Sequence, residues 1–173
     1  MIKVGKVIVA TAVLAGGFFG AFTTNEVSHA APVVKTVNVQ HQKTIKDTVN
    51  KAKQGKTINS DKTGVGSTSA QIKKRWGKPD AGSDKENLYY SKWRLYFQLE
   101  HDKTVSLYSN DKRFDNITVQ EVKKEAGQKP YKTRSGADAY YLDYKEGKYT
   151  LTFGFYYDDH GKPSTLKEVS VSK

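Results

Sequence analysis

The residues that could carry catalytic or metal chemistry are few and scattered. The chain has no Cys, which excludes thiol chemistry and disulfides. Three of the four His residues lie after residue 30: His41, His101 and His160. Asp158-Asp159-His160 could ligate a metal, but adjacent ligands on a turn are a weak signal and a solvated hairpin turn accounts for them. No Gly-x-Ser-x-Gly, His-Glu-x-x-His or phosphate-loop motif occurs, so we expect no catalytic residue, no metal site, no cofactor and no enzyme activity.

Basic side chains cluster in two short segments of the chain. Lys and Arg with nearby Tyr can hold a phosphate backbone and stack bases, so these segments predict polyanion binding. The alternative is that they are only the solvated faces of helices whose inner faces carry Ile72 and Val122. The candidate polyanion-binding residues are Lys73, Lys74, Arg75, Lys78, Lys123, Lys124, Lys129, Lys132 and Arg134.

One uncharged segment, residues 149–157, has the pattern of a self-assembling strand. It contains no Pro and is rich in β-formers, which is typical of cross-β segments when they are exposed. The alternative is a strand that the native sheet protects. Because an exposed edge of this kind is a standing hazard, we expect the segment to lie inside the sheet. The predicted assembly residues are Tyr149, Leu151, Phe153, Phe155 and Tyr157, and residues 95–99 are a weaker second candidate.

The first thirty residues predict export. Lys3 and Lys6 precede a short apolar run, and residues 28–30 read Ser-His-Ala, which is typical of a secretory signal peptide cleaved after Ala30. The run is shorter than a membrane span, and no Cys follows it to carry a lipid anchor. The alternative is a permanent N-terminal anchor. We expect a secreted, extracellular or cell-surface protein without a membrane span in the mature chain, in which residues 31–43 form a flexible segment.

The net charge predicts the class of partner. The 29 Lys and Arg and 18 Asp and Glu give +11, and removal of residues 1–30, with Lys3, Lys6 and Glu26, leaves +10. Such a charge favours polyanions such as extracellular DNA or teichoic acid, unless it serves only solubility. The eleven Tyr suit half-exposed sheets and binding faces, because Tyr combines a large contact area with a polar end.

Two stretches fifty residues apart predict equivalent helices. Thr68 and Thr118 are each followed three residues later by Gln or Glu, which is a capping box, and each stretch ends with Gly and then Pro. Another helix is predicted over residues 44–54, with Thr44 as its cap and Gly55 as its end. Each of the three predicted helices is short and sharply bounded.

Period-two alternation predicts the strands. Apolar residues alternate over 93–99 and over 149–155, and a turn and a third strand follow each stretch, at 105–107 and 169–171. Tyr89-Tyr90 corresponds to Tyr140-Tyr141 in this reading, and Trp93 to Tyr144.

These elements predict an α+β fold. Two tandem helix-plus-three-strand units, about 44–110 and 111–173, would form one antiparallel sheet with the helices packed on one face.

The quoted pattern resembles a known kind of tandem domain. Thr-x-x-Gln-Ile from Thr68, Gly-Lys-Pro-Asp at 77–80 and the strand of alternating aromatics are similar to β-lactamase-inhibitor and small-protein-A domains. The resemblance covers about 44–171, and it implies protein binding or envelope assembly rather than catalysis. In size, charge and secretion the chain is also similar to small basic proteins of the staphylococcal biofilm matrix, which are non-enzymatic scaffolds that can form amyloid-like fibres.

Together these patterns predict a secreted, non-enzymatic structural protein of the extracellular matrix. It would act by self-association and by binding anionic polymers or cell-surface proteins. Two alternatives stay open. One is a protein-binding module that uses an open sheet face with exposed Tyr as anchors. The other is an extracellular nucleic-acid-binding protein.

Overall fold

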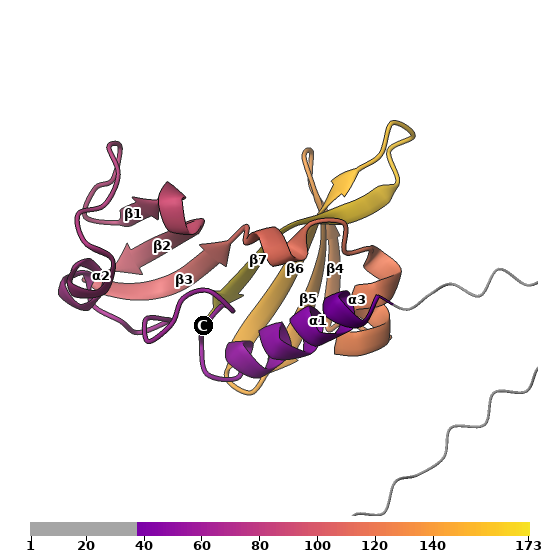
Figure 1. Cartoon of the computed structure of the whole chain (residues 1–173), viewed down its shortest axis with the longest axis horizontal. Coiled ribbons are helices and arrows are strands. Elements are labelled where there is room, and N and C mark those ends of the chain that lie inside the picture. The colour runs from indigo at the N-terminus through magenta and orange to yellow at the C-terminus, as the bar shows by residue number, and fades with distance from the viewer. Residues whose placement is uncertain (1–37) are drawn as a thin grey trace, which may run out of the picture. The chain divides into compact units, whose positions relative to one another are not determined.

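The computed structural model describes residues 38–173 (Figure 1). The predicted signal peptide and its cleavage after Ala30 lie outside the described residues and stay predictions. The helices are α1 (Val39–Ala52), α2 (Ser69–Trp76) and α3 (Val119–Ala126), with 3-10 turns η1 (Ser91–Trp93) and η2 (Lys112–Phe114). The strands are β1 (Asn87–Tyr90), β2 (Leu95–Glu100), β3 (Lys103–Ser109), β4 (Lys132–Ser135), β5 (Tyr140–Glu146), β6 (Tyr149–Tyr157) and β7 (Pro163–Ser172).

All seven strands join one antiparallel sheet in the order β1-β2-β3-β7-β6-β5-β4. The junction between the early and late strands is the β3–β7 pair, where Leu107 lies opposite Val171 and Ser109 opposite Val169. The two edge strands, β1 and β4, have only four residues each. The predicted α+β class and antiparallel sheet are confirmed.

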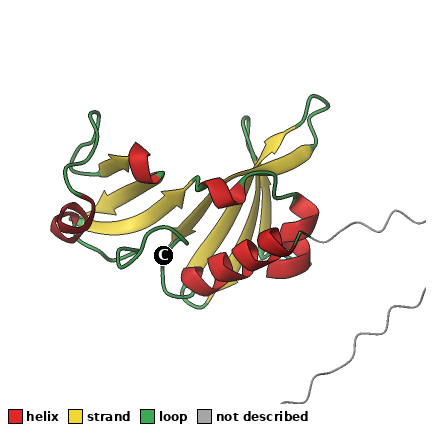
Figure 2. Cartoon of the chain, in the orientation of Figure 1, coloured by secondary structure: helices red, strands yellow, loops and turns green. Residues whose placement is uncertain are grey.

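The three helices pack on the same face of this sheet (Figure 2). Ile72 of α2 packs over β1–β3, whereas Ile45 of α1 and Val122 of α3 pack over β5–β7. Directly paired residues of antiparallel strands point to the same face, and one such row joins both regions. The row contains Phe97, Leu107, Val171 and Leu151, all 0% exposed.

The two predicted capping boxes are present. The Thr68 hydroxyl accepts from the Gln71 N–H at 3.3 Å, and the Gln71 side chain accepts from the Thr68 N–H at 2.9 Å. Thr118 and Glu121 make the same reciprocal pair at 3.3 and 2.8 Å. Both helices therefore begin where local hydrogen bonding satisfies the first free amides, independently of the core.

A tyrosine is tied to the glycine that ends each of these helices. The Tyr90 hydroxyl donates to the Gly77 carbonyl at 3.1 Å, and the Tyr144 hydroxyl donates to the Gly127 carbonyl at 2.9 Å. Each ring also meets a phenylalanine ring edge-on, at interplanar angles of 89° and 86°. Tyr90 and Tyr144 are thus structurally equivalent.

This equivalence corrects the predicted correspondence between the two stretches. Tyr90 shares these contacts with Tyr144, so they do not support the predicted matches of Tyr90 with Tyr141 and of Trp93 with Tyr144. The additional strand β4 between α3 and β5 lengthens the second stretch. Trp93 is also not a strand residue, since it lies in η1 and is 45% exposed. Arg94 follows it with φ +54, which interrupts the alternation before β2 begins.

Helix α1 begins earlier than predicted. The Asn38 side chain accepts from the N–H groups of residues 40 and 41 at 3.1 and 3.2 Å, so the helix spans Val39–Ala52 rather than 44–54. The prediction of a flexible segment over 31–43 is therefore wrong for 39–43. Thr44 is not a cap, since it lies within the helix and is 3% exposed.

Contacts with α3 explain why the start of α1 is ordered. His41 Nδ1 lies 2.9 Å from a Glu121 carboxylate oxygen, and the Gln42 amide donates to both Glu125 oxygens at 3.1 Å. Ile45 continues the same contact into the core over β5–β7. The predicted first unit, 44–110, is therefore not a packing unit, because α1 packs with the later strands.

Candidate binding surfaces

The structure does not bring the predicted polyanion-binding residues together. Those on and after α2 belong to the β1–β3 half of the fold, and those on and after α3 belong to the other half (Figure 1). Of the latter, Lys132 and Arg134 lie in the edge strand β4 itself. The lysines are open to solvent apart from the half-buried Lys123. The exposed ones are Lys73, Lys74, Lys78, Lys124, Lys129 and Lys132.

The two predicted arginines are already paired within the chain. Arg75 Nε lies 2.5 Å from a carboxylate oxygen of Asp61. Arg134 donates twice to Asp143, at 2.8 and 3.0 Å, and its guanidinium lies 4.6 Å from the centre of the Tyr141 ring. These ion pairs occupy both guanidiniums, so the lysines are the cations most open to a polyanion.

The predicted assembly segment is strand β6, and its position inside the sheet is confirmed. Hydrogen-bonded neighbours, β5 and β7, flank it on both sides. Leu151, Phe153 and Phe155 are 0% exposed. The sheet edge nearest to it, β4, is short and carries Lys132 and Arg134, which discourage pairing with another chain. In the native sheet both edges of this segment are therefore already paired, and assembly through it would require the sheet to open.

The turn that could have held a metal is organised by hydrogen bonds. Asp158 accepts from the N–H groups of His160 and Lys162 at 2.9 and 2.8 Å. Within residues 38–173, no group of three or more His, Asp or Glu side chains is placed to hold a metal ion. None of the helices over this range is long and apolar enough to cross a membrane.

The sheet face opposite the helices, here called the uncovered face, carries a row of stacked tyrosines. Tyr89, Tyr96 and Tyr108 are directly paired on β1, β2 and β3. The first two rings are stacked with centroids 4.8 Å apart, and the second and third are 5.2 Å apart. With Arg94 and Glu168 they line a hollow of about 580 Å³, which we call the tyrosine hollow.

Burial and hydrogen bonds shift the pKa values of two acidic groups on the uncovered face. Burial favours the neutral form of Asp143, but hydrogen bonds from Arg134 and Thr152 outweigh it and place the pKa of Asp143 below its ordinary value. Burial raises the pKa of Glu168 beside the tyrosine hollow. Gly154 makes room for this arrangement, since a Cβ there would lie 3.1 Å from the Tyr141 ring.

We predict that acid destabilises the fold. The pKa of Glu121 is also lowered, because hydrogen bonds from Thr118 and His41 outweigh burial. A carboxyl group whose pKa is lowered by folding stabilises the fold fully above the ordinary pKa, 3.8 for Asp and 4.5 for Glu. This stabilisation is lost as the pH falls through the pKa of the folded state. Glu168 has a raised pKa, so its stabilisation is present below pH 4.5 and is lost as the pH rises, which offsets part of the loss in acid.

Urea unfolding from pH 7 to pH 3 tests this prediction. The urea concentration at half unfolding should decrease as the pH drops below about 4.5. Asp143→Asn should weaken that decrease and cost about 1.5–3 kcal/mol at pH 7, the range for hydrogen bonds to charged groups. Asp159→Asn, on the exposed turn, is the control and should behave like the wild type. A midpoint that is equal at pH 3 and pH 7 would contradict the prediction.

The sequence analysis did not identify the tyrosine hollow as a site. The alternation that predicted β2 does contain one indication of it, because the residues between the buried ones, such as Tyr96, must point away from the helices. The sequence does not show that Tyr96 lies beside Tyr108, which follows from the register of β2 and β3, or that Glu168 lies nearby, which follows from the β3–β7 pairing.

Comparisons with known proteins identify the fold. A family model described as a domain of unknown function (DUF4309) matches residues 45–172. The crystal structure of a DUF4309 family protein (YjgB) from Bacillus subtilis is similar, with a TM-score of 0.65 and 18% identity over 78% of this chain and 99% of that one. A cysteine-rich secretory protein (SAV1118) from Staphylococcus aureus has a TM-score of 0.40 and 14% identity over 63% of this chain and 44% of that one, too low to carry an argument. No curated protein matches the chain.

Proposed function

Because the chain belongs to the DUF4309 family, whose description assigns no activity, we propose a function from the geometry: a secreted, non-enzymatic binding protein of the extracellular matrix. Its partner is a cell-surface protein that docks on the uncovered face. The observation that carries this proposal is the tyrosine hollow, placed on a sheet face that none of the three α-helices of residues 38–173 covers.

The tyrosine hollow has the chemistry of a protein-binding centre. Tyr offers large contact area and is enriched among the residues that dominate binding energy. The rings are held before binding, since they stack on one another and the Tyr96 hydroxyl donates to Asn87 at 2.6 Å. Such preorganisation reduces the entropy lost on binding.

The charged residues of this protein indicate what chemistry the partner's surface should have. Arg94 and Glu168 place polar groups beside the rings, as in the polar rim of a protein interface. The net charge of +10 on residues 31–173 favours an acidic partner and speeds the encounter with it. We therefore expect an acidic protein surface with an apolar or aromatic centre.

Affinity capture with matched variants tests this function. The mature protein should retain a stoichiometric partner from cell-surface material, and Tyr96→Ala and Tyr108→Ala should each weaken that complex at least tenfold. Tyr131→Ala is the control, because Tyr131 is 69% exposed and belongs to no strand. Equal capture by all of these proteins would refute the uncovered face as the docking surface.

We further infer that the fold consists of two related units, which share the uncovered face. The paired capping boxes and the equivalent Tyr90 and Tyr144 hydrogen bonds support this inference. Helix α1 then lies outside the first unit and β4 is an addition to the second. The β3–β7 pair joins the two units and makes their outer faces continuous.

A further inference from the structure

A second hollow of the molecule holds both tryptophans of the chain. It has a volume of about 630 Å³, and we call it the tryptophan groove. The rings of Trp76 and Trp93 lie 5.5 Å apart between centroids, with their planes at 53°. Trp76 is fixed, because its Nε1–H donates to the Thr63 hydroxyl at 2.9 Å. Trp93 is 45% exposed and offers its ring to a ligand.

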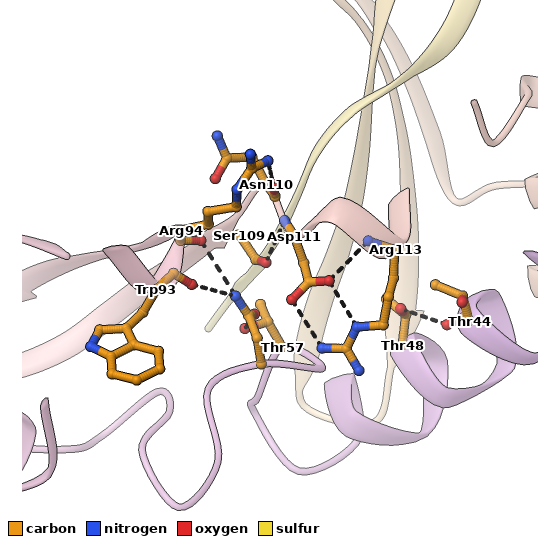
Figure 3. Close-up of polar contacts among 10 residues, drawn as sticks. Thr44, Thr48, Thr57, Trp93, Arg94, Ser109, Asn110, Asp111 and Arg113 are labelled. Atoms are coloured by element: carbon orange, nitrogen blue, oxygen red, sulfur yellow. Dashed lines mark hydrogen bonds and ion pairs between the residues drawn. The ribbon is translucent and has the colours of Figure 1, made fainter. Parts of the chain in front are cut away.

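The backbone beneath Trp93 is held from two directions (Figure 3). The Asn59 amide donates to the carbonyls of Trp93 and Arg94, at 2.9 and 3.5 Å. The Arg94 guanidinium donates to the Asn110 carbonyl at 3.0 Å, which joins η1 to the end of β3. The exposed ring therefore projects from an anchored turn, and its ordering cost is met before a ligand arrives.

Three lysines without an ion-pair partner in the part of the chain that the structure describes line the tryptophan groove. Lys51, Lys92 and Lys112 line the tryptophan groove, and none of them forms an ion pair within residues 38–173. The Lys92 ammonium lies 5.0 Å from the centre of the Trp93 ring.

The two acids of the groove are neutralised by arginines. Asp61 pairs with Arg75, and Asp111 accepts two hydrogen bonds from the Arg113 guanidinium, at 2.7 and 3.0 Å (Figure 3). The hydrogen bond from Arg75 places the pKa of Asp61 below its ordinary value. Burial favours the neutral form of Asp111, but hydrogen bonds from Arg113 outweigh it and place the pKa of Asp111 below its ordinary value as well. The three lysines therefore leave the groove positive.

We propose that the tryptophan groove binds single-stranded nucleic acid. A base stacks on the exposed face of Trp93, while Lys51, Lys92 and Lys112 contact the neighbouring phosphates. The tilt of the two rings leaves no parallel slot between them, so the stacking surface is the part of the Trp93 ring that is open to solvent, where a base would take the place of the Lys92 ammonium over the ring. Bases in a duplex are stacked on one another and cannot reach this ring, which favours a single strand.

This ligand differs from the protein partner proposed for the uncovered face. The two surfaces share Arg94 among their lining residues, and the test therefore leaves Arg94 unchanged. Stacking is tolerant of base identity, so we expect little sequence preference.

Intrinsic fluorescence reports this site directly, because the chain has only two Trp and both lie in the groove. Oligothymidylate of about 16 nucleotides, the upper end of common single-strand site sizes, should quench the emission saturably. The affinity should fall steeply as salt rises, because binding releases counterions. Duplex DNA and poly(glycerol phosphate), which present phosphates without accessible bases, should bind more weakly.

Variants separate stacking from general charge, with a labelled oligothymidylate and fluorescence anisotropy as the measurement. Trp93→Ala should weaken binding about 5- to 150-fold, the range for loss of one stacked base, and Trp93→Phe should restore part of it. Lys92→Gln with Lys112→Gln should weaken binding and flatten the salt dependence. The control replaces four lysines on the outer faces of α2 and α3 with Gln and should retain the fluorescence quench. The control positions are Lys73, Lys74, Lys123 and Lys124.

Three outcomes would overturn the proposal. The first is unchanged affinity in Trp93→Ala at an unchanged melting temperature. The second is a loss of binding in the four-lysine control that exceeds the loss in Trp93→Ala. The third is poly(glycerol phosphate) binding as tightly as oligothymidylate, which would make the site a receptor for phosphate charge alone.

Discussion

Phe153→Ala is expected to lower the free energy of unfolding by about 3–5 kcal/mol, the range for truncation of a buried Phe. Phe153 is 0% exposed and lies in the middle of β6, between two hydrogen-bonded strands. Its ring meets Tyr144 edge-on at 5.8 Å, so truncation leaves a cavity beneath a ring that is tied to α3. Chemical denaturation measures the loss. Tyr156→Ala on the same strand is the control and should cost much less, because Tyr156 is 51% exposed.

The same substitution tests self-association through β6. Because both edges of β6 are paired in the native sheet, assembly should be slow for the wild type. It should be faster for Phe153→Ala, in which the destabilised sheet opens more often. Phe153→Lys should unfold the chain more readily still and yet suppress fibres, since it would repeat a charge about every 4.8 Å along a stack. Only a specific assembly segment separates instability from fibre formation in this way.

The isolated peptide 149–157 removes the native fold from the comparison. The unmodified peptide should form dye-binding fibres, and the peptide with Lys at position 153 should not. If the unmodified peptide stays soluble and dye-negative for days at high concentration, β6 is not an assembly core, and the predicted matrix role rests on the binding surfaces alone.

Ile72→Ala carries the second large expected effect, a loss of about 2–5 kcal/mol. Ile72 is 0% exposed and is the one fully buried residue of α2, where it packs on Phe97 and Leu107. Lys73→Ala, at the next position but on the exposed side, should change the stability by about 0.5 kcal/mol or less. Thermal melting of the two variants compares them directly. Equal and small effects would contradict the placement of α2 on the sheet.

The location of the Ile72→Ala effect is also predicted. The buried cluster around Ile72 is separate from the larger cluster beneath α1 and α3. Hydrogen exchange should therefore lose most protection in β1–β3 and less in β5 and β6. A uniform loss across all seven strands would indicate that the two clusters unfold as one cooperative unit.

Features that depend on neighbouring residues in the sequence were determined by the sequence itself. The capping boxes at Thr68 and Thr118 need only side chains three residues apart, and glycine at the helix ends needs only a backbone that tolerates positive φ. The alternation of apolar residues over 149–155 likewise predicted the strand β6, because alternation is a local pattern of the sequence. The burial of all five residues 151–155 was not part of that pattern and depends on the neighbouring strands. These features established the α+β class and the antiparallel sheet.

The candidate sites depend on tertiary structure because their residues are distant in the sequence. Strand register brings the Tyr96 and Tyr108 rings to 5.2 Å. It also places Asp143 beside Arg134, which converts a predicted free cation into half of an ion pair. The early start of α1 depends on Glu121 and Glu125 of α3, about eighty residues away.

Trp76 and Trp93 show most clearly that a site can depend on the tertiary structure. Trp76 ends α2 and Trp93 ends η1, with β1 between these elements in the chain, and the tertiary packing brings their rings to 5.5 Å. Local patterns specify which elements form and which side chains face inward. Whether outward side chains from different elements meet is decided by strand order and helix placement, which minimise exposed apolar surface over the whole chain.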